Sequence, residues 1–396
     1  MKILPKGIIK KYTQTVGVNN EIDEIMRLTL FFTRIFGHHI LDPNWTWNIT
    51  FPYQLATLLL ISYVIVGTLE IIRGTNDVKL IAEAAYTFIV IVVMQTRFYF
   101  FLSTRKHFQH LYIQMKTTLY NSILDDPEKN LKDVLKKLRM VVNWMAFFCF
   151  FPVVIYILTT LWCYVNGEKR LMSKTTSILM PMRTPYYEIG LLLHSIFMFS
   201  AAFTIGEVEI WFVMMMIFFR SACDGTEKYL SVEARHENES QLDYAIRLKN
   251  SLRKFYKSHV KEIEFLNTLN AMFKWLGMMP LISVALCICL ILLLLSKGID
   301  MTFVSNVIPV IVELFVYNWF GEEIKIKAEK WKSAILEFDW LNLLPKDKKC
   351  YCILVCYMSK EFGIKIATGT FLSLLTMSAS LKFSYQAFTV LQTMDI

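Results

Sequence analysis

Seven continuous apolar runs separate the polar segments of this 396-residue chain. Each run has about the length that an α-helix needs to cross the roughly 30 Å hydrocarbon core of a bilayer. The runs are uninterrupted rather than alternating, which excludes a transmembrane β-barrel. Hydrophobic residues make up 55% of the chain, above the roughly 45–50% typical of soluble domains. The sequence therefore predicts an all-α integral membrane protein with seven transmembrane helices, at 51–72, 78–101, 141–164, 186–218, 271–296, 301–320 and 364–391.

Positively charged residues indicate how the chain is oriented. Most of its 42 Lys and Arg residues lie before the first apolar run or in three long links, 102–140, 219–270 and 321–363. Because Lys and Arg concentrate on the cytosolic side of a membrane, we expect an intracellular N-terminus and an extracellular C-terminus. Sequons at Asn44 and Asn48 conflict with this orientation, and we expect them to be unused.

Several function classes are excluded by what the sequence lacks. The net charge of +9 is accounted for by the cytosolic links, and no motif for nucleic-acid binding is present. Only Cys163 of the eight cysteines lies near a predicted outer surface, so we expect no disulfide. Cys350, Cys352 and Cys356 lack His partners and the spacing of a zinc site. With no nucleophile in register with a base, we predict no enzyme activity, no metal and no cofactor.

Two of the long links continue the apolar runs as helices. Residues 240–270 place apolar side chains near helical spacing and enter the fifth run without a breaker. Residues 322–340 extend the sixth run in the same way. We expect the later helices to project into the cytosol, where their apolar faces are buried against each other or against another subunit.

Acidic residues inside the runs are costly in lipid and therefore point to specific partners. Glu207 and Glu209 are two residues apart and cannot share a helix face. For these two and for Glu313 we favour internal salt bridges over a role in attracting cations to an aqueous vestibule. Lys274 and Arg220 are the expected partners.

The last apolar run is rich in small and hydroxylated side chains. Thr376, Ser380 and Ser384 are spaced by four residues, so a helix places them on one face. Such a stripe either lines a hydrated pore or allows close contact between helices, and we favour the pore.

The C-terminal part of the chain contains stretches that resemble a known family. His259 stands in YKSHVKEIEFLN, residues 318–340 read NWFGEEIKIKAEKWKSAILEFDW, and residues 382–392 read KFSYQAFTVLQ. The last of these is similar to a Ser-Phe/Tyr-Ser-Tyr-Phe-Thr-Val-Leu ending. With the predicted topology, these stretches resemble the insect odorant receptors. The motifs cover about 255–392, and the earlier part resembles the family in layout.

The resemblance implies the ligand-tuning subunit of an odorant-gated, non-selective cation channel in the plasma membrane of sensory neurons. It implies a heterotetramer with an odorant co-receptor, anchored by the cytosolic helix extensions. The seventh span would line the pore, with Val390 and Leu391 at an apolar constriction that blocks ions by dewetting. The anchor residues that match the family motifs are His259, Gly321, Glu323 and Trp340.

The same resemblance implies an odorant site within the outer half of the membrane bundle. A volatile ligand needs an apolar cavity with few polar groups, because burial of its apolar surface supplies most of its affinity. Glu83 and His194 are the sharper candidates, either for a hydrogen bond to the ligand or for a contact with each other. The candidate lining residues, chosen by depth and type, are Glu83, Tyr86, Val90, Val154, Leu158, Trp162, Tyr187, Leu191, His194, Met198 and Ser305.

The chain then divides into six segments. These are a cytosolic N-terminal segment (1–50), helices 1–4 with the ligand-binding bundle (51–218), the cytosolic extension of helices 4 and 5 (219–270), transmembrane helices 5 and 6 (271–320), a cytosolic anchor segment (321–363), and the pore-lining helix with a short extracellular tail (364–396).

Two alternative functions remain open. The related gustatory receptors share the channel architecture, although the KFSYQAFTVLQ ending favours the odorant branch. A secondary transporter is less favoured, because the two halves show no repeat and no paired broken spans.

Overall fold

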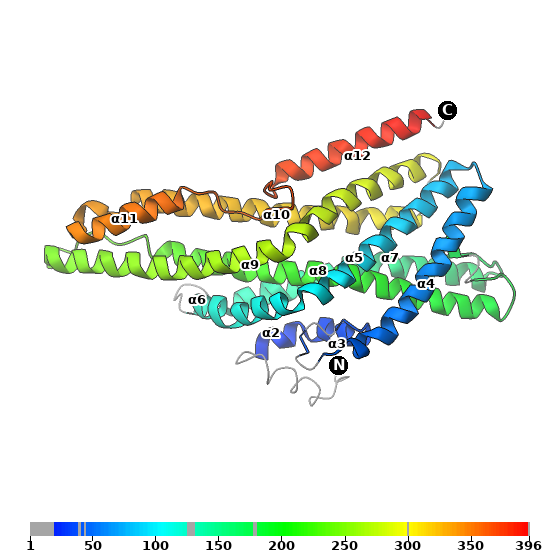
Figure 1. Cartoon of the computed structure of the whole chain (residues 1–396), viewed down its shortest axis with the longest axis horizontal. Helices are drawn as coiled ribbons and strands as arrows, with labels where there is room; N and C mark the ends of the chain where they lie inside the picture. Colours follow the sequence, from blue (N-terminus) through cyan, green and yellow to red (C-terminus); the bar gives the residue numbers. More distant parts are fainter. Residues whose placement is uncertain are drawn as a thin grey trace.

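The computed structural model is an elongated bundle of long helices (Figure 1). It describes residues 20–38, 41–42, 45–124, 131–176, 180–298 and 301–394, so residues 1–19 and the sequon residue Asn44 lie outside the described part. The elements are α2 (Asn20–Ile25), α3 (Arg27–Ile35), α4 (Trp47–Gly74), α5 (Val78–Gln114), η1 (Met115–Leu119), α6 (Tyr120–Leu124), α7 (Leu131–Val165), η2 (Lys174–Thr176), α8 (Tyr186–Lys228), α9 (Gln241–Ser296), α10 (Met301–Glu337), η3 (Trp340–Asn342), α11 (Pro345–Met358) and α12 (Leu374–Met394).

Six helical segments in the described part of the chain are long and apolar enough to cross a membrane. They are α4, α5 with its continuation to Ile123, α7, α8, α9, and α10 from Val304. These segments contain the first five predicted spans and nearly all of the sixth, so the prediction of an all-α membrane protein is confirmed for six candidate spans. The orientation of the chain in the membrane stays a prediction.

The last predicted span differs from the structure. α12 begins at Leu374 rather than at 364, and it is not among the six segments that are long and apolar enough to cross. Before it, Lys365 and Phe371 form an antiparallel bridge, and Gly369 adopts a φ of +85°, which glycine tolerates because it has no Cβ. The prediction of a continuous helix from 364 is therefore wrong, because a tight turn occupies its first residues. A transmembrane α12 stays a prediction.

The predicted helical extensions are present. α9 has 56 residues and joins 241–270 to the fifth span without a break. Ser240 caps its start, because the Ser240 hydroxyl accepts a hydrogen bond from the Asp243 amide at 3.1 Å. α10 likewise continues to Glu337. The cytosolic location of these extensions stays a prediction.

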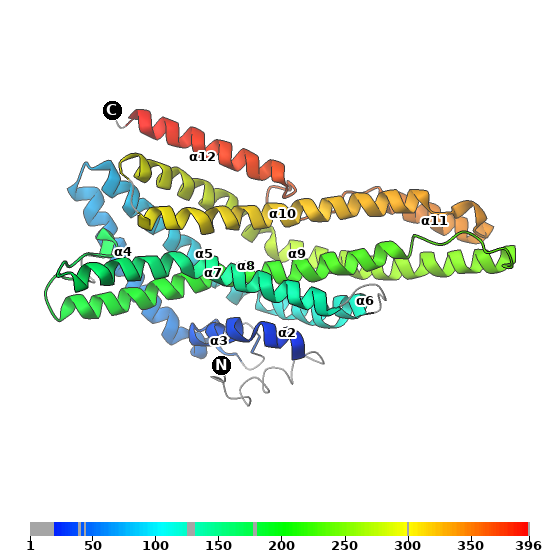
Figure 2. The same cartoon turned by 180° about the vertical axis from the view of Figure 1, so that it is seen from behind.

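The largest buried core includes the extensions and the parts of α8 and α11 packed on them (Figure 2). Trp211 is fully buried in it, with the rings of Phe108 and Tyr112 edge-on at 4.7 and 5.4 Å. Trp331 is also buried and donates a hydrogen bond to the Cys223 carbonyl at 3.3 Å. Leu252, Phe255, Ile263 and Leu266 of the extensions are buried within the chain, whereas Leu242, Ile246 and Val260 are exposed. Burial of the exposed apolar residues against another subunit stays a prediction.

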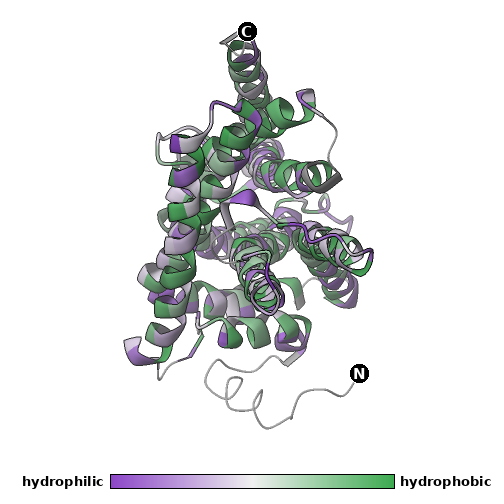
Figure 3. Cartoon of the chain, turned by 90° about the vertical axis from the view of Figure 1, so that its right-hand side faces the viewer, coloured by the Kyte–Doolittle hydropathy of each residue, from purple (hydrophilic) through white to green (hydrophobic). Residues whose placement is uncertain are grey.

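The opposite end of the molecule exposes apolar side chains on its outside. Figure 3 shows the helices seen from this end, with long stretches of hydrophobic residues in green. On α4, Leu55, Leu58, Leu59 and Leu69 are exposed. A helix of a soluble bundle would place polar residues there, whereas an apolar outer face suits contact with lipid.

Candidate functional site

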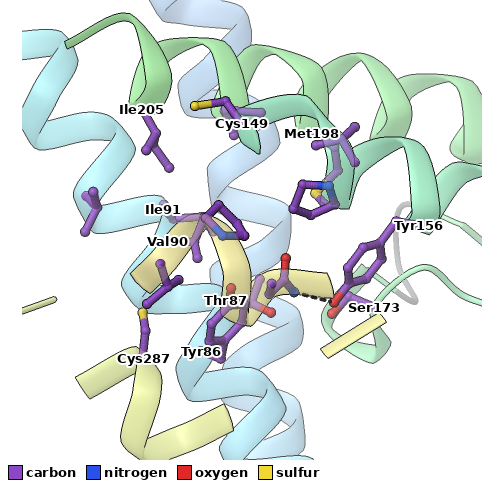
Figure 4. Close-up of a pocket in the computed structure, with 18 of the residues that line it drawn as sticks. Tyr86, Thr87, Val90, Ile91, Cys149, Tyr156, Ser173, Met198, Ile205 and Cys287 are labelled. Carbon is purple, nitrogen blue, oxygen red and sulfur yellow. Dashed lines mark hydrogen bonds between the residues drawn. The ribbon is translucent and has the colours of Figure 1, made fainter. Parts of the chain in front are cut away.

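A cavity of about 190 Å³ lies inside the bundle, with walls from α5, α7, α8, α9 and α10. Its wall is mainly apolar, as Val90, Ile91, Met198 and Ile205 show in Figure 4. An engineered cavity of about 150 Å³ in another protein binds benzene, so this space suits a molecule with one ring or a short chain. The geometry favours binding of a small apolar compound over catalysis.

A buried ion-pair cluster borders this cavity. Arg97 of α5 donates to Glu209 of α8 at 2.8 Å and also bonds Glu313 of α10. Both carboxylates belong to the cavity wall. A buried charge is tolerated when it is paired and hydrogen-bonded, and Arg97 further donates to the Ile205 carbonyl at 2.7 Å. The cluster therefore fixes three helices against one another beside the cavity.

The internal pairing predicted for the acidic residues is confirmed, but the predicted partners are wrong. Arg97 pairs with Glu209 and Glu313, and Glu207 bonds the buried ring of His38. Lys274 is exposed on α9 and Arg220 pairs with Glu323 at 3.1 Å instead. The partners differ because the tertiary structure determines which side chains meet. The rotation of each helix about its axis places Arg97 next to Glu209 and Glu313, and the segment after α3 places His38 next to Glu207.

The polar groups of the wall have different surroundings. Glu83 accepts hydrogen bonds from the Lys174 amide at 3.1 Å and the Ser173 hydroxyl at 3.4 Å. The Asn306 amide donates to the Tyr156 hydroxyl at 3.2 Å, which is the dashed line in Figure 4. His194 is 3% exposed, and its Nδ1 has no hydrogen-bond partner among the described residues. The alternative of a His194–Glu83 contact is therefore wrong.

Comparison with protein families decides which class the chain belongs to. The family described as 7tm Odorant receptor matches residues 77–385. The chain belongs to the insect odorant receptor family. The predicted family resemblance is confirmed, and membership places the protein among receptors rather than enzymes.

Solved structures agree with this odorant receptor in fold. The insect olfactory receptor OR5 from Machilis hrabei matches with a TM-score of 0.73 and 12% sequence identity, over 94% of this chain and 99% of that chain. The structure of OR5 from Machilis hrabei in complex with eugenol matches with a TM-score of 0.72 and 12% identity, over 95% and 100%. A comparison with curated protein sequences finds no match.

Five of the residues predicted to line the odorant site do line the cavity. They come from α5 and α8 and are Glu83, Tyr86, Val90, His194 and Met198. They were chosen by depth in the predicted spans and by residue type. Depth and type do not specify which face of a helix points inward, so they identified only part of the wall.

The other six predicted lining residues lie elsewhere. Val154, Leu158 and Trp162 of α7 are 40%, 56% and 71% exposed on the outer surface. Tyr187 is buried, but its hydroxyl donates to the Arg170 carbonyl at 2.9 Å, and Leu191 packs in the same small core. Ser305 is buried but is not part of the cavity wall, whereas the next residue, Asn306, lines the cavity. A role for these six residues in ligand binding stays a prediction.

Sequence reasoning missed several residues of the wall in this receptor. Asn306 follows the predicted residue Ser305, and Tyr156 lies between the predicted residues Val154 and Leu158. Asn306 and Tyr156 line the cavity, whereas these three predicted neighbours do not. Ser173 lies in the link before η2. This link has no periodic pattern of apolar residues from which its position could be predicted. Pro152 and Pro309, already noticeable as prolines inside spans, both belong to the wall. These two prolines were the sequence feature that could have identified this part of the cavity wall.

The hydroxyl stripe of α12 contacts the receptor's own bundle. Thr376 donates to the Asn318 side chain of α10, and Ser380 donates to the Leu281 carbonyl of α9 at 3.1 Å. Ser384 donates to the Ser380 carbonyl at 2.8 Å. The bonds of Thr376 and Ser380 are contacts of close helix packing, whereas the Ser384 bond lies within α12. The pore-lining role of the stripe stays a prediction.

The C-terminal end of α12 is exposed, whereas the turn before it is held against α10. Val390 and Leu391 are 57% and 37% exposed in the single chain.

The turn before α12 packs closely against α10. A Cβ on Gly321 would lie 2.4 Å from the Leu372 carbonyl oxygen, so only glycine permits this close approach. The Leu374 amide donates to Glu322 at 3.2 Å. The family-like stretch that begins at Asn318 therefore positions the start of α12.

The remaining predicted anchor residues lie in or beside the core of the extensions. His259 is fully buried, with its ring stacked on Phe255 at 5.4 Å and edge-on to Trp331 at 4.8 Å. Trp340 is 38% exposed and stacks on Tyr351 at 5.7 Å. These contacts stabilise the extensions within one chain. Their role in joining subunits stays a prediction.

Proposed function

We propose that this protein is an odorant receptor subunit that binds a small volatile ligand in the cavity beside Arg97. Ligand binding gates a non-selective cation channel, which the chain forms as a heteromer with an odorant co-receptor in the plasma membrane of sensory neurons. The observation that supports this function most directly is the mainly apolar cavity of about 190 Å³ inside the bundle.

The cavity has the properties that a volatile ligand requires. Its apolar wall favours burial of a hydrocarbon skeleton at about 25 cal/mol per Å². Its few polar groups can fix orientation without a large cost of desolvation. A relative of the same fold, OR5 from Machilis hrabei, has a structure in complex with eugenol.

The channel part of the proposal uses α12 and the segments that hold its start. In an assembly of four subunits, α12 of each subunit lines the pore, and the outer residues Val390 and Leu391 form the constriction. Asn318, Gly321 and Glu322 of α10 contact residues 372–376. A shift of α10 next to the cavity is thereby transmitted to the start of α12.

Co-expression with an odorant co-receptor tests this function. Cells that produce both chains are recorded by whole-cell voltage clamp during application of a broad panel of volatile compounds. We expect an inward cation current that reverses near 0 mV and requires both chains. Each chain expressed alone is the control, with surface labelling to confirm delivery.

Three other outcomes are informative. Current from this chain alone would show a homomeric receptor and overturn the heteromer. Absence of current for every compound, with both chains at the surface, would overturn odorant gating. An epitope at residue 1 that is accessible on intact cells would overturn the proposed orientation.

A further inference from the structure

His194 lies in the cavity wall with its Nδ1 enclosed and without a hydrogen-bond partner among the described residues. The ring is 3% exposed, and its contact with Phe197 is edge-on at 6.4 Å between centroids. A neutral imidazole has one N–H donor and one acceptor nitrogen. Burial of these groups without a partner is unfavourable, so a ligand that supplies one gains binding free energy.

Neighbouring polar groups of the wall are already engaged. The hydroxyls of Thr87 and Ser283 donate to backbone carbonyls one turn earlier, at 3.0 and 2.7 Å. Asn306 is bonded to Tyr156, and the two inner carboxylates hold Arg97. Nδ1 of His194 and Oε2 of Glu209 are thus two buried atoms of this wall from which a ligand can obtain a hydrogen bond without breaking one inside the protein. Of the two groups, the neutral imidazole can present either a donor or an acceptor, whereas a carboxylate only accepts.

We propose that the ligand of this cavity is a small neutral hydroxyl compound, an alcohol or a phenol, whose O–H group hydrogen-bonds to the ring of His194. The proposal rests on the odorant-binding function proposed above and adds the chemical class of the ligand. A hydroxyl both donates and accepts, so it pairs with either tautomer of His194, whereas a carbonyl only accepts. A hydrocarbon of equal size fills the space but leaves the imidazole unpaired.

The charge of the wall argues against an acid as the ligand. Glu83, Glu209 and Glu313 contribute three carboxylates, and Arg97 is the cation bonded to the inner two. A ligand carboxylate would meet like charges in a site of low dielectric constant, which is unfavourable. The neutral hydroxyl group avoids this repulsion.

Matched ligand pairs test the proposal in cells that express the full chain with an odorant co-receptor. The pairs are benzyl alcohol with toluene, 1-hexanol with hexane, and phenol with benzene, and benzaldehyde and benzylamine complete the first series. We expect the hydroxyl member of each active pair to have an EC50 at least about tenfold lower, equivalent to about 1.4 kcal/mol.

Two substitutions of His194 separate hydrogen bonding from shape. His194→Leu should remove the preference for the hydroxyl member and leave the response to the hydrocarbon in place. His194→Gln retains a donor and an acceptor and should restore most of the preference. Leu192→Ala, on the same helix and 62% exposed, is the matched control and should leave the EC50 ratio unchanged. Surface labelling checks that each variant is delivered.

The outcomes distinguish this inference from the proposed function. If no compound in the broad odorant panel evokes current, the proposed function fails and this inference fails with it. If compounds evoke current but the hydrocarbon or benzylamine is the most potent member of its series, only the hydroxyl class is overturned. The same conclusion follows if a delivered His194→Leu receptor keeps the wild-type EC50 ratio.

Discussion

Arg97 of α5 bonds Glu209 of α8 at 2.8 Å while its second terminal nitrogen bonds Glu313 of α10. The side chains of Arg97 and Glu209 are each 2% exposed, and that of Glu313 is 13% exposed. One cation thus serves two carboxylates from different helices at the edge of the cavity. Any movement of α10 against α8 at this level changes the contacts of Arg97.

Replacement of Arg97 by Met should destabilise the receptor strongly. It leaves Glu209 and Glu313 buried without their cation, and breaking a buried pair in this way costs about 3–5 kcal/mol. We expect a large loss of folded protein at the surface and of thermal stability in detergent. The triple variant Arg97→Met, Glu209→Gln, Glu313→Gln should recover stability, because it removes the unpaired charges.

The control for this prediction is the pair of Arg220 with Glu323 at 3.1 Å, in which the arginine side chain is 47% exposed. Arg220→Met should cost no more than about 1 kcal/mol. An Arg97→Met receptor as stable as the Arg220→Met receptor would show that the buried cluster is not required for folding.

Filling the cavity should weaken the odorant response without unfolding the protein. Val90 lines the cavity, so Val90→Phe places a ring inside a space of about 190 Å³. We expect EC50 values to rise by tenfold or more, equivalent to about 1.4 kcal/mol or more of lost binding free energy. Val92→Phe is the matched control, since Val92 is on the same helix and 41% exposed. Equal effects of the two substitutions on EC50 would argue against this cavity as the ligand site.

A side chain at Gly321 should disturb the start of α12. In Gly321→Ala the new Cβ meets the Leu372 carbonyl oxygen at 2.4 Å, and backbone atoms cannot move aside cheaply. We expect a cost of about 1–3 kcal/mol, measured as lower thermal stability, and a reduced odorant current at equal surface delivery. Gly74→Ala is the control, because a Cβ there meets nothing within 4 Å. Unchanged stability and current in Gly321→Ala would mean that α12 does not depend on this contact.

Glu262 should make stability depend on pH between about 4.5 and 8. It lies before the predicted fifth span, is 1% exposed, and accepts a hydrogen bond from Thr226 at 2.5 Å. Burial raises the pKa of the Glu262 carboxyl from 4.5 to about 8. The folded state therefore keeps this proton longer than the unfolded state, so stability falls as pH rises, by about 1.4 kcal/mol per pH unit within this window.

His259 opposes this effect in the lower part of the same pH range. Burial lowers the pKa of its ring from 6.5 to about 4, so its contribution to stability rises between these values and is constant above 6.5. Unfolding in detergent at pH 6.5 and 8 should therefore show that Glu262→Gln removes the loss of stability seen in the wild type. Glu239→Gln is the control, because the Arg247 hydrogen bond lowers the pKa of the Glu239 carboxyl. An unchanged pH slope in Glu262→Gln would contradict the prediction.

Substitution of Val390 by Ala tests the constriction of the proposed pore. A smaller apolar side chain widens the ring and favours wetting, so basal cation current should increase several-fold without odorant. Leu375→Ala, at the opposite end of α12 and 79% exposed, is the control for a general effect on this helix. A basal current in Val390→Ala equal to that of the wild type, at equal delivery, would remove Val390 from the gate.

Much of the fold could be predicted because each helix follows from local sequence. The unbroken helix from 241 to Ser296 was expected from apolar spacing alone. The turn before Leu374 was not, because it depends on Gly369 and on contacts with α10. In the cavity, Val90 and His194 were expected from their depth in the spans, whereas Asn306 required the rotation of α10.

The amino-acid sequence by itself determined the class of this protein. Apolar runs long enough to cross a bilayer must be helical, because lipid offers no partner for backbone groups. The partners of the buried charges were decided only by tertiary structure. Arg97 lies 112 residues from Glu209 and 216 from Glu313, so no local pattern relates them. Helix rotation and crossing bring these groups together, and the same packing leaves Nδ1 of His194 without a hydrogen-bond partner among the described residues.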